Sequence, residues 1–451
     1  MSAAQGSLLR VGRSPALRGR CRVPGDKSIS HRALLFSALC RGPVEIRGLG
    51  SGGDNASTAA ALRGLGVPIQ TEGASVRVEG VGFSGLREAA SALDCGNSGT
   101  SMRLLCGLVA GRPFATTLAG DPSLSRRPMG RVAKPLRLMG ARIEGRPDPA
   151  RPDEILPPLT IHGGNLRGID YALPVASAQL KSALLLAGLQ AEGQTRIEEP
   201  GPSRDHSERM LRCLGAPISA DASGRRIVVA PTGWDGRLAA TQVDVPGDLS
   251  SAAFLLVAAA VVPGSDVTVE EVGLNPTRTG VLDGLRAMSA DLEVEQTGEA
   301  MGEPVGRVRV RFRGPLCATR VAGELALRAI DEIPALAVAS ALARGRSEFA
   351  DLGELRVKES DRIASIGREL RRAGFAVEEF ADGFAIEGRA GEPVKGGRVR
   401  PERDHRIAMA GALLGLLSDE ETLVPSEDIA TSFPTFAEII QMLGGNLKSV
   451  L

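Results

Sequence analysis

Basic and hydroxyl side chains gather where apolar, helix-forming stretches begin. The first such start reads PGDKSISHR, with Lys27, Ser28 and Arg32 directly ahead of ALLFSAL. Later starts carry a similar set of polar residues: Asn97, Thr100 and Arg103, then Ser177, Gln179 and Lys181, then Arg406. A helix N-terminus has unpaired N–H groups and a partial positive charge, and arginine binds carboxylates and phosphates through paired hydrogen bonds. We therefore predict a ligand that bears several anionic groups.

Three acidic residues stand among these basic groups. Asp331 and Glu332 precede the helix-like stretch IPALAVASALA, and Glu359 lies in LRVKESDR beside Lys358 and Arg362. Neighbouring cations keep a carboxylate ionised at neutral pH, and in that state it can accept a proton. The same acids could instead serve only as salt-bridge partners of those cations. The sequence leaves both interpretations open.

The elements that position these residues repeat along the chain. The turn V-P-G-D occurs at Val23 and again at Val245, and each copy precedes an Ala- and Leu-rich run. Weaker copies begin near positions 94, 173, 330 and 404. A run that is apolar nearly all round predicts a buried helix, and such repetition indicates internal duplication. Strand-like and amphipathic segments alternate with the copies, for example DVTVEEVG at 266–273 and DRIASIGRELRRAGF at 361–375.

This repetition predicts an α/β fold with two similar lobes, each holding three buried helices surrounded by sheets and outer helices. We expect residues 25–244 to form the first lobe, and residues 1–24 together with 245–451 to form the second. The chain would then cross between lobes near 23–26 and 243–248. Both V-P-G-D turns are candidate hinges, because proline fixes one backbone dihedral and glycine frees another.

Composition excludes several other classes of protein. The 451 residues include 54 Lys and Arg against 53 Asp and Glu, so no bulk charge draws the chain to nucleic acid or membrane. Aromatic residues make up 3%, too few for the stacking surfaces of single-strand binders. No apolar run reaches the roughly 18 residues of a membrane span. The spacing of four histidines and six cysteines predicts reduced thiols and no metal site. The first twenty residues lack the apolar segment of a secretory signal, so we expect a cytoplasmic protein.

Nine ordered motifs resemble the 5-enolpyruvylshikimate-3-phosphate (EPSP) synthase family, the 3-phosphoshikimate 1-carboxyvinyltransferases. These motifs are PGDKSISHR, GNSGTSMR, RRPM, LPVASAQLKSALLLAGL, PSRDHSERML, VPGDLSSAAF, IDEIPALAVA, LRVKESDR and DHRIAMA. The resemblance implies two lobes, each of three βαβαββ units with buried parallel helices, closing over substrates in a cleft. It implies transfer of the enolpyruvyl group of phosphoenolpyruvate to the 5-hydroxyl of shikimate 3-phosphate, through a tetrahedral intermediate and with release of phosphate. This step belongs to the shikimate pathway, which leads to chorismate and the aromatic amino acids. We expect no metal or organic cofactor, no nucleic-acid or membrane partner, and a monomer.

The resemblance also implies roles for single residues. Those expected to bind shikimate 3-phosphate are Lys27, Ser28, Arg32, Ser177, Ala178, Gln179, Arg204, Asp331 and Lys358. Those expected to bind phosphoenolpyruvate are Lys27, Gly99, Arg127, Gln179, Arg362 and Arg406. Asp331 would take the proton of the 5-hydroxyl, and Glu359 with Lys27 would deliver and remove the proton at the phosphoenolpyruvate methylene. Further candidates that line or support the pocket are Asp54, Asn97, Thr100 and Arg103.

Some positions depart from common family patterns. Ala178 stands where many members have a second serine, and Thr431 where many have a lysine, so each puts one substrate contact in doubt. IDEIP, RRPMGRV and SRDHSERM resemble the family's second, often glyphosate-tolerant class. That tolerance is tied to alanine in the phosphoenolpyruvate pocket, where this chain has Gly99. We therefore expect glyphosate to compete with phosphoenolpyruvate.

Two alternative functions come from different classes. The sister enolpyruvyl transferase that acts on UDP-N-acetylglucosamine uses a loop cysteine, but AGDPSLSRRPMGRV has none and Cys106 lies in a predicted helix. A non-catalytic anion-binding scaffold would lack an acid or a base, yet Lys27, Asp331 and Glu359 are all present. A P-loop is excluded because GDKS lacks its glycine spacing, and no G-x-S-x-G turn supports a serine hydrolase.

Overall fold

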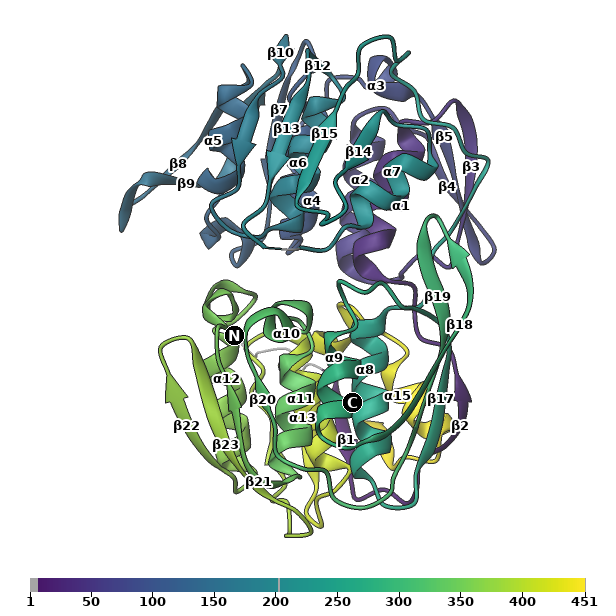
Figure 1. Ribbon diagram of the computed structural model, residues 1–451, viewed down its shortest axis with the longest axis vertical. Helices are drawn as coiled ribbons and strands as arrows, with labels where there is room; N and C mark the ends of the chain where they lie inside the picture. Colours follow the sequence, from purple (N-terminus) through teal and green to yellow (C-terminus); the bar gives the residue numbers. More distant parts are fainter. Residues whose placement is uncertain (1–6, 202, 451) are drawn as a thin grey trace. The chain divides into compact units, whose positions relative to one another are not determined.

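The chain divides close to its two V-P-G-D turns. Residues up to Pro24, Pro246–Gly298 and the residues from Pro304 onward form unit 1, whereas Gly25–Val245 and Glu299–Glu303 form unit 2. The computed structural model describes residues 7–201 and 203–450 (Figure 1). The first six residues of the expected second lobe therefore lie outside the described residues. The short segment 299–303, which we expected in that lobe, groups with unit 2.

Three buried helices form the centre of unit 2, as its apolar runs predict. They are α1 (Lys27–Ala38), α4 (Gly99–Val109) and α6 (Ala178–Gly188). Nearly every residue beyond their first turns is buried. A side chain caps each N-terminus by accepting a hydrogen bond from a backbone N–H three residues on; the caps are Asp26, Ser98 and Ser177.

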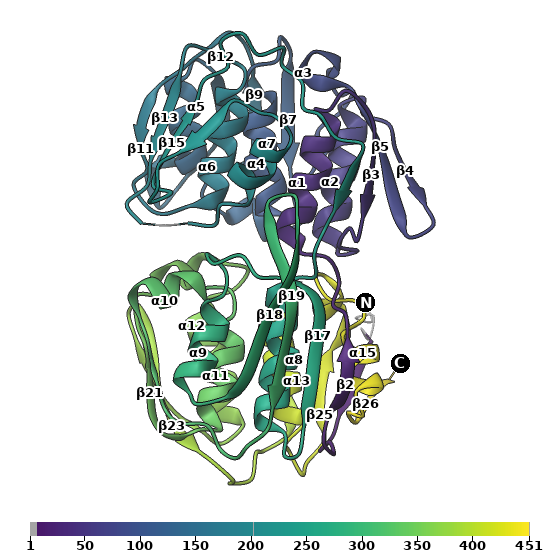
Figure 2. The ribbon, with the colours of Figure 1, turned by 45° about the vertical axis from the view of Figure 1, so that its right-hand side comes forward.

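Three four-stranded sheets surround these helices (Figures 1 and 2). The first runs in the order β16 (Gln242–Asp244), β3 (Gly42–Arg47), β5 (Ser75–Gly80) and β4 (Ile69–Glu72). The second runs β6 (Leu93–Asp94), β7 (Ala115–Ala119), β9 (Arg151–His162) and β8 (Arg142–Asp148). The third runs β11 (Asp170–Ala172), β13 (Thr195–Glu198), β15 (Arg226–Val229) and β14 (Ile218–Ala220). In each sheet the first pair of strands is parallel and the other two pairs are antiparallel.

The remaining elements of unit 2 are shorter or lie outside the central helices. The outer helices are α2 (Gly53–Gly64), α5 (Gly130–Leu138) and α7 (His206–Cys213). The short elements are α3 (Gly82–Gly85), the 3₁₀ turn η1 (Leu124–Arg126), and the parallel strands β10 (Leu166–Arg167) and β12 (Ala191–Glu192).

Unit 1 repeats this plan. Its central helices are α8 (Leu249–Val261), α11 (Ile333–Ala341) and α13 (His405–Gly415), and every residue in them is buried. Its outer and short helical elements are α9 (Gly280–Ala287), α10 (Gly323–Arg328), η2 (Gly353–Val357), α12 (Arg362–Arg372), α14 (Ser426–Ala430) and α15 (Phe436–Met442). The predicted buried helices are therefore confirmed in both halves of the repeat.

Two of the sheets of unit 1 each include one strand from the N-terminal part of the chain. One sheet runs β18 (Asp291–Ala300), β19 (Glu303–Arg311), β17 (Asp266–Gly273) and β2 (Arg18–Cys21). The second runs β20 (Arg320–Val321), β21 (Arg344–Phe349), β23 (Gly383–Arg389) and β22 (Ala376–Phe380). The third runs β24 (Gly397–Arg398), β25 (Thr422–Pro425), β1 (Leu8–Val11) and β26 (Leu447–Val450). Within residues 7–201 and 203–450, six four-stranded sheets with one shared plan confirm the predicted fold class.

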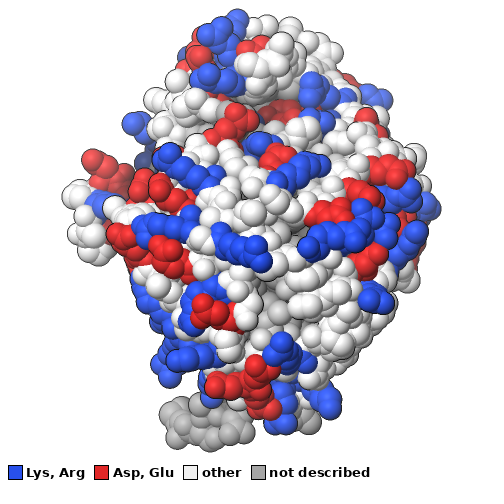
Figure 3. All heavy atoms as spheres, turned by 60° about the horizontal axis from the view of Figure 1, so that its bottom comes forward, with Lys and Arg blue, Asp and Glu red and all other residues white. Residues whose placement is uncertain are grey.

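Each unit has its own hydrophobic cluster of buried side chains. The cluster of unit 1 contains the side chains of α8, α11 and α13, and that of unit 2 contains those of α1, α4 and α6. None of the helices in the described part of the chain is long and apolar enough to cross a membrane. On the face that Figure 3 presents, Lys and Arg are interspersed with Asp and Glu, in line with the balanced composition.

Candidate active site

The start of α1 places a lysine beside a carboxylate. Nζ of Lys27 lies 3.0 Å from Oδ2 of Asp54, which is in the first turn of α2. The two side chains are only 18% and 12% exposed, so the ion pair is largely sheltered from water. Partial burial strengthens such a pair relative to an exposed one. Asp54, a supporting candidate from the sequence, therefore fixes the amine of Lys27.

Arg32, one turn further along α1, is 2% exposed. Its guanidinium donates to Ser207 Oγ at 2.7 Å, to the Ser28 carbonyl at 2.8 Å and to Ser182 Oγ at 2.8 Å. Burial lowers the pKa of Arg32 to about 10; the charges of Glu208, Asp26 and Glu303 oppose this shift, and the charge of Arg204 adds to it. Arg32 stays protonated at neutral pH, but its bonded partners are neutral oxygens. It ties α1 to α6 and α7.

A second group links the starts of α4 and α6. Arg103 donates to Gln179 Oε1 at 2.7 Å, and Gln179 Nε2 donates to Thr100 Oγ1 at 2.8 Å. Arg127 donates to Asn97 Oδ1 at 2.7 Å. The structure thus brings together five of the residues expected at the phosphoenolpyruvate pocket.

Gly99 lies between the two arginines of this group. A methyl group built on Gly99 would lie 2.8 Å from Arg103 Nη1 and 3.3 Å from Arg127 Nη1. Any side chain at position 99 would therefore press on the cations that the sequence associates with phosphoenolpyruvate. The glycine keeps this space open.

At the start of α6, Lys181 does not have the anion-binding role that its position in the sequence predicted. Ser177 caps the helix, and the Ala178 carbonyl accepts a hydrogen bond from Ser182 Oγ at 2.6 Å. Lys181, which the sequence places among the anion-binding groups, is 1% exposed and pairs with Glu199 at 2.6 Å and Glu208 at 2.7 Å. Both carboxylates come from later segments of the chain. Lys181 is therefore a buried structural cation.

Arg362 is the centre of the corresponding group in unit 1. Its guanidinium contacts Asp404 Oδ2 at 2.8 Å, Glu359 Oε2 at 2.7 Å and Asp331 Oδ1 at 3.2 Å, and it is 1% exposed. Burial alone would lower the pKa of Arg362, but the charges of Asp404, Glu359 and Asp331 outweigh it and leave the pKa above its usual range. The arginine is permanently charged and orients the acids around it.

Asp331 is bordered by further cations. Its Oδ1 also lies 3.6 Å from Nζ of Lys358, and its carbonyl accepts a hydrogen bond from Arg406 Nη1 at 2.8 Å. Its side chain remains 14% exposed. Asp331 and Glu359 do form the salt bridges that the sequence allowed, and they stay partly accessible. The structure thus brings Asp331, Lys358, Glu359, Arg362 and Arg406 into one cluster.

Sequence reasoning missed two carboxylates that hold these groups. Asp404 caps α13 and binds both Arg362 and the hydroxyl of Ser360, the latter at 3.0 Å. Asp121 accepts a hydrogen bond from Asn97 Nδ2 at 2.7 Å. An aspartate directly ahead of a helical run is a capping signal, so the motif DHRIAMA could have indicated Asp404. No local pattern marks Asp121.

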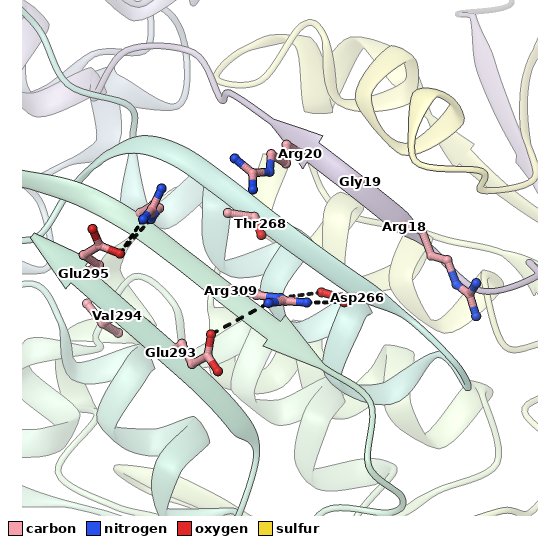
Figure 4. A pocket seen from close by; sticks show the side chains of 10 residues that line it. Arg18, Gly19, Arg20, Asp266, Thr268, Glu293, Val294, Glu295 and Arg309 are labelled. Atoms are coloured by element: carbon pink, nitrogen blue, oxygen red, sulfur yellow. Dashed lines mark hydrogen bonds and ion pairs between the residues drawn. The ribbon is translucent and has the colours of Figure 1, made fainter. Parts of the chain in front are cut away.

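A separate hollow of about 670 Å³ lies over β2, β17, β18 and β19 (Figure 4). It contains none of the residues predicted from the sequence. Arg309 pairs with Asp266 and Arg307 with Glu295, both at 2.6 Å, so these arginines are already neutralised by carboxylates. Among the described residues, no group of three or more His, Cys, Asp and Glu side chains could hold a metal ion.

Comparison with known proteins identifies the family. The model of EPSP synthase (3-phosphoshikimate 1-carboxyvinyltransferase) matches residues 11–440. The chain belongs to the EPSP synthase family. A 3-phosphoshikimate 1-carboxyvinyltransferase from Halorhodospira halophila is 52% identical over 446 residues, which covers 98% of this chain and 97% of that protein. One from Acidithiobacillus ferrooxidans is 49% identical over 439 residues, with 97% of both chains covered.

Solved structures agree with the assignment to the EPSP synthase family. EPSP synthase from Acinetobacter baumannii matches with a TM-score of 0.86 and 42% identity, covering 99% of this chain and 100% of that one. The enolpyruvyl transferase NikO from Streptomyces tendae matches with a TM-score of 0.77 at 17% identity, which shows the shared fold alone. The resemblance found in the nine sequence motifs is thus confirmed at the level of the family.

Proposed function

We propose that this chain is a 3-phosphoshikimate 1-carboxyvinyltransferase whose proton transfers depend on Asp331, Glu359 and Lys27. The observation that carries the proposal is the cluster around Arg362, where two partly exposed carboxylates, Asp331 and Glu359, share one buried arginine. Lys358 stands beside Asp331 as a second cation. Such surroundings favour ionised carboxylates, which can take protons at neutral pH.

The reaction would proceed by addition and then elimination. Asp331 takes the proton of the 5-hydroxyl of shikimate 3-phosphate while the oxygen of that hydroxyl bonds to C2 of phosphoenolpyruvate. Glu359 takes up a proton from solvent when the anionic substrates bind, and it then supplies this proton to C3, assisted by Lys27, so that the methylene becomes a methyl group. In the second step the C2–O bond to phosphate breaks, the proton held by Asp331 passes to the departing phosphate, and Glu359 takes a proton back from C3. The products are 5-enolpyruvylshikimate 3-phosphate and phosphate.

The remaining predicted residues would bind the anionic groups of the substrates. We assign shikimate 3-phosphate to Lys27, Ser28, Arg32, Ser177, Ala178, Gln179, Arg204, Asp331 and Lys358. We assign phosphoenolpyruvate to Lys27, Gly99, Arg127, Gln179, Arg362 and Arg406. Paired hydrogen bonds from arginine suit the carboxylate and the phosphate that each substrate carries. The linked side chains of Arg103, Gln179 and Thr100 support this assignment.

We also propose hinges at 23–26 and 243–248, and a monomeric, cytoplasmic enzyme without nucleic-acid or membrane partners. The backbone N–H of Asp248 donates to the Pro24 carbonyl at 2.9 Å, so the two crossings leave unit 1 side by side. All six cysteines are unpaired, which supports a reducing compartment. Light scattering after size-exclusion chromatography would test the monomer.

The decisive experiment measures phosphate release from phosphoenolpyruvate with shikimate 3-phosphate or UDP-N-acetylglucosamine as acceptor. We expect release only with shikimate 3-phosphate. The variants Asp331→Asn and Glu359→Gln should lower kcat by about 100-fold or more, since each removes an acid–base group. Glu392→Gln, an exposed acid paired with Arg389, should behave like the parent protein. Release with UDP-N-acetylglucosamine, or full activity of both site variants, would contradict the proposal.

A further inference from the structure

The two V-P-G-D turns place matching residues at the starts of α1 and α8. Asp26 and Asp248 both cap their helices, so Ser28 in unit 2 corresponds to Ser250 in unit 1. Lys27 has Leu249 as its counterpart, so the start of α8 has no lysine of its own. The start of α8 nevertheless faces an anion, and that anion is a side chain of the protein.

The anion is the carboxylate of Glu332, which is fully buried. Ser250 Oγ donates to Glu332 Oε1, and Arg278 Nη2 donates to the same Ser250 Oγ. Arg278 Nη2 also lies 3.7 Å from Glu332 Oε1. The other carboxylate oxygen, Oε2, has no hydrogen-bond partner among the described residues.

A second arginine approaches the same carboxylate from α13. Nη1 of Arg406 lies 3.9 Å from Glu332 Oε1 and donates to the Asp331 carbonyl at 2.8 Å. Arg278 and Arg406 are both nearly buried, with side chains 4% and 7% exposed. Two buried guanidinium groups near one point repel each other unless a negative charge lies between them. Glu332 lies within 3.9 Å of both arginines and supplies that charge, and Asp248 is a second carboxylate beside Arg278, at 3.2 Å.

We propose that Glu332 is a positioning residue of the transferase: it occupies, from within the chain, the anion position at the start of α8 and thereby fixes Arg406 and the backbone of Asp331. The proposal rests on the assignment of Arg406 to phosphoenolpyruvate and of Asp331 to the 5-hydroxyl. Because Glu332 is fully buried and bonded to Ser250, it does not itself exchange protons with substrate. Its neighbour Asp331 is partly exposed. Of these two adjacent acids, we therefore assign Glu332 to positioning and Asp331 to catalysis.

Kinetics of Glu332→Gln test the proposal, because glutamine keeps the shape of the side chain and one acceptor oxygen but removes the negative charge. We expect the KM for phosphoenolpyruvate to rise by about tenfold or more, with a smaller change in the KM for shikimate 3-phosphate. Glu332→Asp keeps the charge and should recover part of the loss. Values for Glu332→Gln within twofold of the parent protein would overturn the proposal.

Chemical rescue separates positioning from a general effect on folding. Glu332→Gly leaves a gap between Arg278 and Arg406, and added formate can supply the missing carboxylate there. We expect formate to restore activity at least tenfold in Glu332→Gly but not in Glu332→Gln, where the gap is filled. A folded glycine variant that formate does not restore would count against the proposal. If Glu332→Gly does not fold, the kinetics of Glu332→Gln decide.

A parallel variant keeps this test separate from the assignment of the site. Arg406→Lys should itself raise the KM for phosphoenolpyruvate, and added formate should not lower that KM again. If Arg406→Lys leaves that KM unchanged, the assignment of Arg406 fails. If Arg406→Lys is impaired while Glu332→Gln is normal, the site assignment stands and the role given to Glu332 fails.

Discussion

Two buried arginines in the candidate site differ in what surrounds them. Arg362 has three carboxylates within 3.2 Å, which outweigh the effect of burial and raise its pKa. Arg32 is bonded to neutral oxygens, and burial lowers its pKa to about 10. An added anion is stabilised more where a buried cation lacks carboxylates in direct contact. At the scale of single residues, the surroundings of Arg32 therefore favour an added anion, whereas Arg362 orients three acids and would share its charge between them and phosphoenolpyruvate.

Gly99→Ala should weaken glyphosate more than phosphoenolpyruvate. The new methyl group would lie 2.8 Å from Arg103 Nη1 and 3.3 Å from Arg127 Nη1, so both guanidinium groups must shift. Overpacking of this kind costs about 1–3 kcal/mol, or roughly 5- to 150-fold in affinity. We expect that loss in the inhibition constant of glyphosate and a smaller rise in the KM for phosphoenolpyruvate. Equal changes in both constants would refute the expectation.

His31 should make the folded protein sensitive to acid. Burial lowers the pKa of His31 to about 3, with Lys27 and Arg32 acting in the same direction and Asp54 and Asp26 opposing it. Below pH 6.5 the unfolded chain takes up a proton that the folded protein does not bind, so stability falls as the pH falls. From pH 7 to pH 5 this single group lowers the free energy of unfolding by about 2 kcal/mol.

Urea unfolding of His31→Gln at these two pH values provides the measurement. The variant should lose about 2 kcal/mol less than the parent protein between pH 7 and pH 5. His162→Gln, whose side chain is 40% exposed, is the matched control for replacing a histidine by a glutamine. The interpretation fails if His31→Gln and the parent protein have the same pH dependence.

At the scale of elements, the first crossing depends on a glycine. A methyl group on Gly25 would lie 1.7 Å from the Gly48 carbonyl oxygen and 3.1 Å from Val245 Cγ1. A backbone atom cannot yield as a flexible side chain can, so Gly25→Ala should lower the free energy of unfolding by about 3 kcal/mol or more. Gly53→Ala, in the first turn of α2 and with nothing within 4 Å, should be neutral or stabilising. Urea unfolding of both variants checks this, and equal stabilities would contradict it.

Local patterns predicted the six central helices and several of the strands, because their signals lie within a few consecutive residues. The apolar run LSSAAFLLVAAAVV indicated α8, and DVTVEEVG coincides with β17. The strand β9 was missed because Pro157 and Pro158 interrupt its pattern. The short strands β1 and β2 were missed because they are defined by partners distant in the sequence, β25 and β17.

The same limit applies to the site. Motifs indicated Lys27, Asp331 and Arg362 as charged groups at helix starts. The structure joins Asp331, Lys358 and Arg362 in unit 1, and Arg103, Gln179 and Thr100 in unit 2. The partners of Lys181 could not be predicted, since Glu199 and Glu208 come from segments without any local link to α6. A residue type at a helix start therefore indicates the capacity to bind an anion. Only the fold decides whether that anion is a ligand or another side chain.

For the molecule as a whole, the two hydrophobic clusters share no side chain, so a core defect should remain within one unit. Leu336→Ala in α11 removes a fully buried side chain and should cost about 2–5 kcal/mol. Hydrogen exchange should then speed up in α8, α11 and α13, while α1, α4 and α6 keep their protection. Leu184→Ala in α6, also fully buried, is the reciprocal variant and should show the opposite distribution. The residues that we assign to shikimate 3-phosphate come from both units. Saturating shikimate 3-phosphate should therefore slow hydrogen exchange in both sets of helices. Equal loss of protection across all six helices in either variant would show that the chain unfolds as one cooperative unit.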